Sequence, residues 1–131
     1  MKAAVALAAV LAASSALTKT VCPAGLLPAR SVELFFGQEV GGRVLSDAEW
    51  AAFLDTEVTP RFPDGLTVWQ AQGQWRPPGG VLAREQTRVM LIELTGAGDE
   101  RAKLAGVIEA YKTRYHQKSV LLVEHGDCIR F

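Results

Sequence analysis

The sequence has few of the residues that mark catalytic or metal sites. It contains two histidines and two cysteines in 131 residues, with neither CxxC nor HxxxH spacing. Without such spacing, too few ligands lie close together to hold zinc or a similar ion. The stretch EHGDC at residues 124–128 is no exception, because adjacent residues of a strand point in opposite directions. We therefore predict no metal site.

The signatures of phosphate loops and serine hydrolases are also missing. GAGDE at residues 96–100 lacks the lysine and the spacing of a P-loop, and no GxSxG elbow occurs. The sequence therefore predicts no bound cofactor and assigns no catalytic residue.

Neither sign of charge is in excess, since 14 acidic residues balance 14 basic ones. No long-range field therefore attracts nucleic acid or an anionic membrane. The apolar run at residues 3–13 is too short for a membrane span, which needs about 20 residues. We predict no nucleic-acid partner and no membrane span.

The N-terminal segment has the pattern of a secretory signal peptide. Lys2 precedes the apolar run of residues 3–13, and small residues follow. We predict a signal peptide over residues 1–16 and a periplasmic or secreted protein. Cleavage after Ala24, a lipoprotein leader ending before Cys22 and a buried alanine-rich helix are the weaker alternatives.

The rest of the chain alternates strand and helix patterns. After an extended lead-in at residues 17–30, we predict a single domain over residues 31–131. Ser46 and Glu49 form a capping box at the start of the first helix. The expected strands are residues 31–37, 66–75, 87–94 and 119–125, and the expected helices are residues 46–58 and 99–115. This βαββαβ order is that of the ferredoxin-like α+β fold, a four-stranded antiparallel sheet with two helices on one face. The other face is left open to solvent, a ligand or a second copy.

Cys22 and Cys128 are predicted to form a disulfide. Exported proteins fold in oxidising compartments, where two cysteines without a metal pattern usually pair. Cys22 precedes the first expected strand and Cys128 follows the fourth, and these strands are antiparallel neighbours in a ferredoxin-like sheet. The alternative is two unpaired cysteines.

Several blocks of the mature sequence resemble a known family. ELFFG, SDAEWAAFLDTEVTPRFPDGLTV, GQW and the closing CIRF are similar to a bacterial exported family, domain of unknown function 3574. The resemblance runs from about Ser31 to Phe131. It implies a small exported protein and supplies no assigned activity or catalytic residues.

The strand at residues 66–75 is the first candidate binding site. Its glutamines, including Gln72, alternate with Trp69, Gly73 and Trp75, so the two sets face opposite sides of the sheet. One interpretation is an edge strand with one wet face. The other is a groove floored by Gly73 and walled by the two indoles, with Arg76 placed to meet an anion.

Three charged residues elsewhere are further candidates for ligand binding. Glu33 and Arg88 interrupt otherwise apolar strands that are expected to be neighbours. Arg61 either pairs with a helix carboxylate, such as Asp55 or Glu57, or belongs to the site.

These patterns favour an exported binding or interaction domain that uses the open sheet face for a small molecule or a second subunit. The alternative is a small cofactor-free enzyme of the dimeric α+β barrel type, which is an analogy at the level of the fold. A pocket holding a titratable group is the feature that would favour the enzyme.

Overall fold

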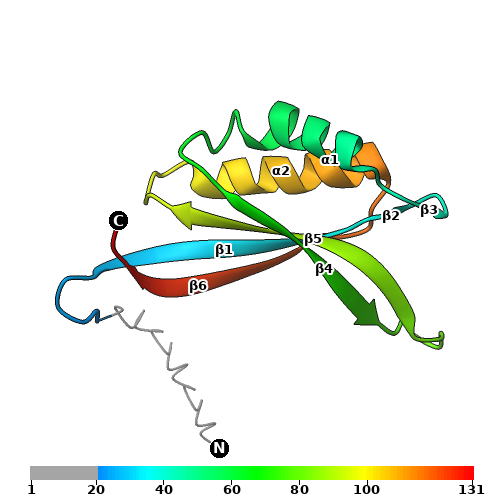
Figure 1. The fold of residues 1–131 in the computed structure, drawn as a ribbon, viewed down its shortest axis with the longest axis horizontal. Helices are drawn as coiled ribbons and strands as arrows, with labels where there is room; N and C mark the ends of the chain where they lie inside the picture. Colours follow the sequence, from blue (N-terminus) through cyan, green and yellow to red (C-terminus); the bar gives the residue numbers. More distant parts are fainter. Residues whose placement is uncertain (1–20) are drawn as a thin grey trace, which may run out of the picture.

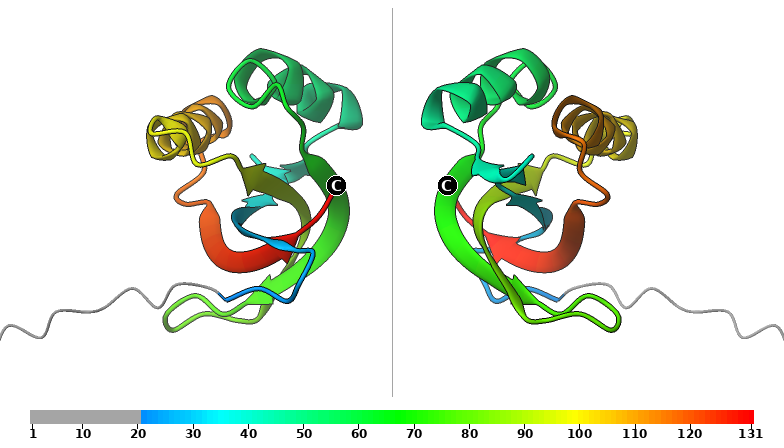
Figure 2. Two further views of the ribbon diagram at one scale, coloured as in Figure 1. Left: turned by 90° about the vertical axis from the view of Figure 1, so that its left-hand side faces the viewer. Right: turned by 90° about the vertical axis from the view of Figure 1, so that its right-hand side faces the viewer.

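A computed structural model describes residues 21–131, and the predicted signal peptide lies outside this range. Four strands form one antiparallel sheet in the order β4-β5-β1-β6, and two helices cover one of its faces (Figure 1). Their bounds are β1 Leu27–Gly37, α1 Asp47–Phe53, β4 Thr67–Trp75, β5 Ala83–Leu94, α2 Glu100–Tyr115 and β6 Leu121–Ile129. This arrangement confirms the ferredoxin-like prediction. Figure 2, which looks along the long axis, shows the helices as one layer and the twisted sheet as the other.

The first helix begins at the predicted capping box. The Ser46 hydroxyl accepts a hydrogen bond from the Glu49 N–H, and the Glu49 carboxylate accepts one from the Ser46 N–H. A hydrogen bond from Arg43, followed by those from Ser46, lowers the pKa of Glu49 to about 2.

After α1 the chain widens into a π-helical turn, η1 (Leu54–Val58). It is closed by a hydrogen bond of 2.9 Å from the Thr59 N–H to the Leu54 carbonyl. The predicted single helix is thus two helical segments.

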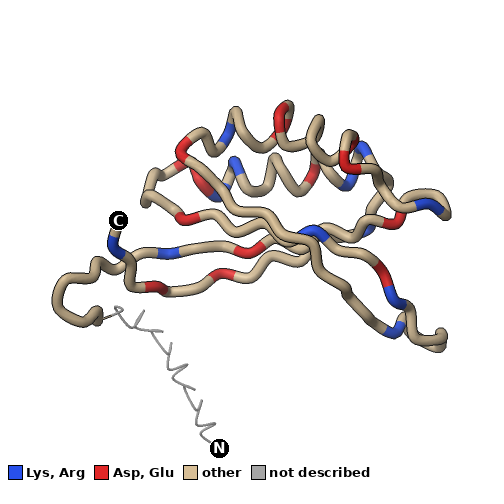
Figure 3. The backbone as a smooth tube through the Cα atoms, in the orientation of Figure 1, with Lys and Arg blue, Asp and Glu red and all other residues tan. Residues whose placement is uncertain are grey.

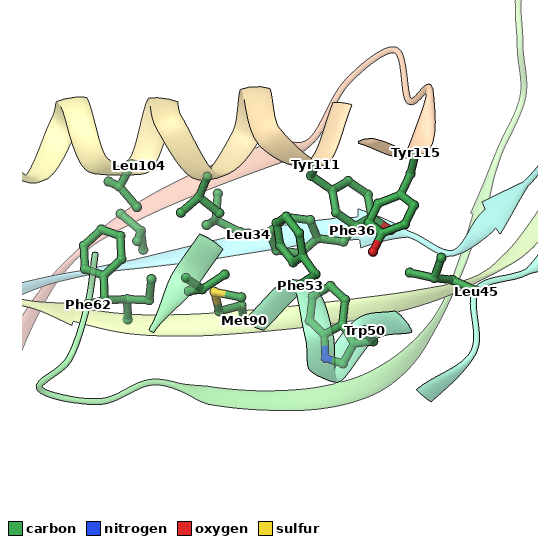
Figure 4. Close-up of a cluster of buried hydrophobic side chains, with 14 residues drawn as sticks. Leu34, Phe36, Leu45, Trp50, Phe53, Phe62, Met90, Leu104, Tyr111 and Tyr115 are labelled. Atoms are coloured by element: carbon green, nitrogen blue, oxygen red, sulfur yellow. The ribbon is translucent and has the colours of Figure 1, made fainter. Parts of the chain in front are cut away.

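The core lies between the sheet and the helices. From Val32 onwards, every second residue of β1 points into it, and the side chains of Val32, Leu34 and Phe36 are fully buried. The Phe36 ring packs edge-on against Tyr111 of α2, with 4.7 Å between the ring centroids. Trp50 of α1 lies 5.3 Å from the same ring (Figure 4). Such aromatic pairs add stability beyond their buried area.

Strand bounds differ from the sequence prediction because backbone pairing continues past the apolar residues. β1 starts at Leu27, opposite Ile129, so the end of the expected lead-in belongs to the sheet. β5 starts at Ala83, opposite Trp75, although Arg84, Glu85 and Gln86 are polar. The connection between β1 and α1, to which the sequence assigned no strand, holds a small hairpin made of β2 (Glu39–Val40) and β3 (Arg43–Val44).

The predicted disulfide is confirmed. Cys22 and Cys128 are bonded, with 5.6 Å between their Cα atoms and a separation of 106 positions in sequence. Cys128 lies inside β6, opposite Pro28, rather than after the strand as the sequence suggested. The bridge therefore ties the residues before β1 to the neighbouring edge strand.

Charged residues of both signs are scattered over the backbone (Figure 3). Within residues 21–131, no helix is long and apolar enough to cross a membrane.

Candidate functional site

The sheet face opposite the helices carries partly exposed apolar side chains. Both tryptophans of β4 lie on it, because Trp69 pairs with Val89 and Trp75 with Ala83. Their exposed fractions are 39% and 53%, and that of Leu121 at the start of β6 is 59%. Removing large apolar side chains from water is favourable, so a ligand or a partner that covers this open face would bind favourably.

One end of the open face forms a cleft of about 710 Å³. Residues of the β4–β5 hairpin make one wall. This hairpin extends beyond the helices at the lower right of Figure 1. The segment that leads from α2 into β6, residues 116–119, makes the other wall. The lining includes Phe35, Gly37, Gly73, Trp75, Glu85, Thr87 and Leu121. The volume is within the range of sites for small organic molecules.

Two glycines shape the floor of the cleft. A Cβ atom on Gly73 would lie 2.9 Å from the Thr87 hydroxyl, so a larger residue would displace that side chain. A Cβ atom on Gly37 would lie 3.2 Å from the carboxylate of Glu85. The absence of a side chain at Gly37 therefore leaves room for the Glu85 carboxylate to lie across the floor.

Glu85 is the acidic residue of this cleft. Burial raises the pKa of its carboxyl above the usual value, and the negative charge of Glu39 raises it further. No hydrogen bond or positive charge offsets these effects. Within the described part of the chain, the carboxylate is thus partly desolvated and unpaired.

A buried hydrogen-bond network fixes Gly37 from the helix side. The Tyr111 hydroxyl donates to the Gly37 carbonyl at 2.6 Å and accepts from the Gln38 amide at 3.0 Å. Burial, more than any neighbouring charge, raises the pKa of Tyr111. The tyrosine therefore stays a neutral donor and holds the Gly37 carbonyl in place from the helix side.

The residues predicted around the tryptophan strand separate into two groups. Gln72 and Trp75 both belong to the lining of the cleft. The Gln72 side chain points to the opposite face of the sheet from Trp75, because Gln72 pairs with Gln86 and Trp75 with Ala83. Trp69 lies on the same face as Trp75 but outside the lining. Arg76 is exposed just after β4 and does not line the cleft either.

Glu33 and Arg88 are on neighbouring strands, as expected, but lie on opposite faces of the sheet. Glu33 is on the open face, where its carboxylate is 3.3 Å from His125 Nε2. Arg88 is opposite Phe36 on the helix-covered face. There it forms an ion pair with Asp47 and lies 6.0 Å from the centre of the Trp50 ring. The two side chains therefore do not form one site.

Arg61 lies in the turn after η1 and is not part of the cleft lining. Its guanidinium is 3.0 Å from the Glu57 carboxylate, which is the pairing expected if Arg61 has a structural role. It also fills the space beside Gly106 of α2.

Sequence reasoning missed Glu85, Thr87 and the wall at residues 116–119. Glu85 stands in the polar run AREQ, which gives no sign of burial. The register that places its carboxylate over Gly37 depends on tertiary contacts. No group of three or more His, Cys, Asp or Glu side chains within residues 21–131 is placed to hold a metal ion.

The molecule is therefore a ferredoxin-like α+β domain with a small-molecule-sized cleft on its open face. Residues 31–131 match the family described as "Protein of unknown function (DUF3574)", and the chain belongs to it. No curated protein matches the sequence.

Solved structures with a similar fold include a phage SAM lyase in complex with S-methyl-5'-thioadenosine. It is 18% identical, with a TM-score of 0.57, and the match covers 77% of this chain and 87% of that one. The same lyase in its apo state gives a TM-score of 0.58 at 18% identity, covering 78% and 87%. CutA from Synechococcus elongatus gives 0.51 at 12% identity, covering 79% and 83%. These likenesses show the fold alone.

Proposed function

We propose that the protein is an exported binding domain that takes a small, partly aromatic organic molecule in the cleft between the β4–β5 hairpin and the start of β6. The observation that carries this proposal is the placement of the half-exposed Trp75 beside an unpaired carboxylate in a cleft of about 710 Å³. Binding sites combine apolar walls with a few polar groups that orient the ligand.

The location outside the cytoplasm belongs to the same proposal. The Cys22–Cys128 disulfide supports it, since such bonds persist in oxidising compartments.

The test uses the tryptophans as a matched pair. Trp75 lines the cleft, whereas Trp69 lies on the same strand and face outside it. Compounds with an aromatic ring, including S-methyl-5'-thioadenosine, are titrated while the indole N–H signals are followed by NMR. We expect a bound compound to shift the Trp75 signal, Trp75→Ala to abolish binding and Trp69→Ala to retain it. Equal loss in both variants would contradict a ligand site in the cleft.

A second copy of the chain is the other occupant that the open face can accept. Trp69 and Leu121 are exposed there, 39% and 59% respectively, outside and at the rim of the cleft. Light scattering after gel filtration measures the oligomeric state directly. A dimer that Trp69→Ala dissociates would assign the face to assembly.

The enzyme alternative is supported by Glu85. A carboxyl group whose pKa is raised by burial is suited to general acid–base catalysis. Mass spectrometry of each bound compound, before and after incubation, distinguishes the two functions. Turnover that Glu85→Gln abolishes would identify an enzyme, and an unchanged compound would identify a binding protein.

A further inference from the structure

The charged groups around the cleft determine which class of ligand it prefers. The inference drawn from them rests on the proposed function. Glu85 and Trp75 are diagonal neighbours on one sheet face, because Gly73 pairs with Glu85 and Trp75 with Ala83. Side chains at diagonal positions are within reach of the same bound molecule. A ligand resting on the indole therefore has one end at the carboxylate.

The carboxylate lacks a partner of its own. Burial and the repulsion from Glu39 both raise the pKa of Glu85, and no cation or donor opposes them. A positively charged ligand group relieves both effects, because it restores an attractive partner to the charged form. The face of a tryptophan ring also attracts cations.

Two basic residues, His116 and Lys118, belong to the opposite wall. Both are exposed to solvent, whereas Glu85 is partly buried. Water screens an exposed charge, and a partly desolvated charge acts through a lower effective dielectric. Glu85 therefore dominates the choice of ligand charge.

We infer that the cleft selects organic cations, such as protonated amines or quaternary ammonium groups carried on an aromatic or aliphatic body. The cationic end lies against the Glu85 carboxylate, and the body packs on Trp75 and Phe35. Gly37 is part of this recognition, since it provides the space in which the carboxylate lies.

The experiment compares three probes with the same aromatic body and different charges: phenethylamine, 2-phenylethanol and 3-phenylpropionate. Each is titrated at neutral pH, with the Trp75 indole signal as readout. We expect the amine to bind about tenfold more tightly than the alcohol, a difference of about 1.4 kcal/mol, and the carboxylate most weakly. Glu85→Gln keeps the shape of the side chain and should remove the preference.

Glu93→Gln is the matched control. Glu93 lies on the same strand and sheet face, and burial, then Asp127, raises its pKa as well, but it is outside the cleft. The control should retain the preference for the amine.

A pH titration of the unmodified protein tests the inference without a variant. As the pH falls through the raised pKa of Glu85, the amine should lose its advantage while the alcohol is unaffected. The other titratable groups near the carboxylate are Glu39 of β2, Tyr111 of α2, and His116 and Lys118 of the wall. The Glu85→Gln variant, titrated over the same pH range, shows how much of the change comes from Glu85.

The outcomes distinguish this inference from the function it rests on. If all three probes bind equally, or the carboxylate binds best, the selection of cations is wrong and the binding function stands. If no probe shifts the Trp75 signal, the selection of cations is wrong, and the binding function is wrong as well if the aromatic compounds of the first test also fail to bind. An amine preference that survives Glu85→Gln would also overturn the role of Glu85.

Discussion

The two faces of the sheet use aromatic residues in opposite ways. On the helix-covered face, Phe36 is fully buried within a cluster of rings from α1 and α2. On the open face, Trp69 and Trp75 stay partly exposed, 39% and 53% respectively. A large apolar side chain stabilises the folded state by being removed from water, so one that remains exposed contributes little to folding. The difference indicates that the first set holds the fold together and the second is available for binding.

The largest expected effect tests this contrast directly. Phe36→Ala should lower the free energy of unfolding by about 3–5 kcal/mol, because it leaves a cavity in a packed core. Trp75→Ala should change it by less than about 0.5 kcal/mol, as for most surface substitutions. Urea denaturation of the two variants measures both values. Similar losses would mean that the open face is part of the core.

The edges of the sheet extend the comparison, since β4 is an untied edge and β6 is tied by the Cys22–Cys128 bridge. Replacing both cysteines by serine should cost about 2–5 kcal/mol. The chain-entropy value for a loop of about 100 residues, about 4.7 kcal/mol, is an upper figure. Thermal unfolding of the oxidised protein and of the double variant gives the difference. A melting temperature unaffected by the substitution would contradict the stabilising role of the bridge.

A smaller effect concerns the start of α1, which places Trp50 in the core. Ser46→Ala should cost about 1 kcal/mol, because a helix-start N–H loses its acceptor. Ser46→Asp, which keeps an acceptor, is the control and should restore most of the loss. Chemical denaturation resolves a change of this size.

The smallest effect is the pH dependence of the same cap. The pKa of Glu49 is lowered from 4.5 to about 2 by hydrogen bonds from Arg43 and Ser46. Because the pKa of Glu49 is lowered by folding, its carboxylate stabilises the folded protein fully above pH 4.5. This contribution is lost as the pH falls towards 2. NMR titration of the Glu49 carboxyl should give this low midpoint, and Arg43→Ala should raise it. A midpoint near 4.5 would show that the pair does not form in solution.

The fold was predictable because its signals are local. The Ser46–Glu49 capping box, the alternation of Trp and Gln in β4, and the apolar residues of β1 each define an element within a few positions. The topology then follows from the order of the elements, and the disulfide follows from the adjacency of the first and last strands.

The site was less predictable because it depends on register. Glu33 and Arg88 were correctly expected on neighbouring strands, but Glu33 is opposite Leu91 and Arg88 is opposite Phe36, so they point to different faces. A shift of one residue exchanges the faces, and no turn joins β1 directly to β5, since α1 and β4 lie between them in the chain. Glu85 was missed for the same reason, since only the three-dimensional structure places it over Gly37.

The bridge between Cys22 and Cys128 also decides how the domain responds to mechanical force. β1 and β6 are antiparallel, with Leu27 opposite Ile129. A pull that separates the two ends of the chain would therefore unzip these strands one residue pair after another, the weakest geometry for a sheet under load. The covalent link stands at the point where such unzipping would start. Tension applied at the ends thus stretches only the segments outside the bridge, and the 106-position loop that it closes remains slack.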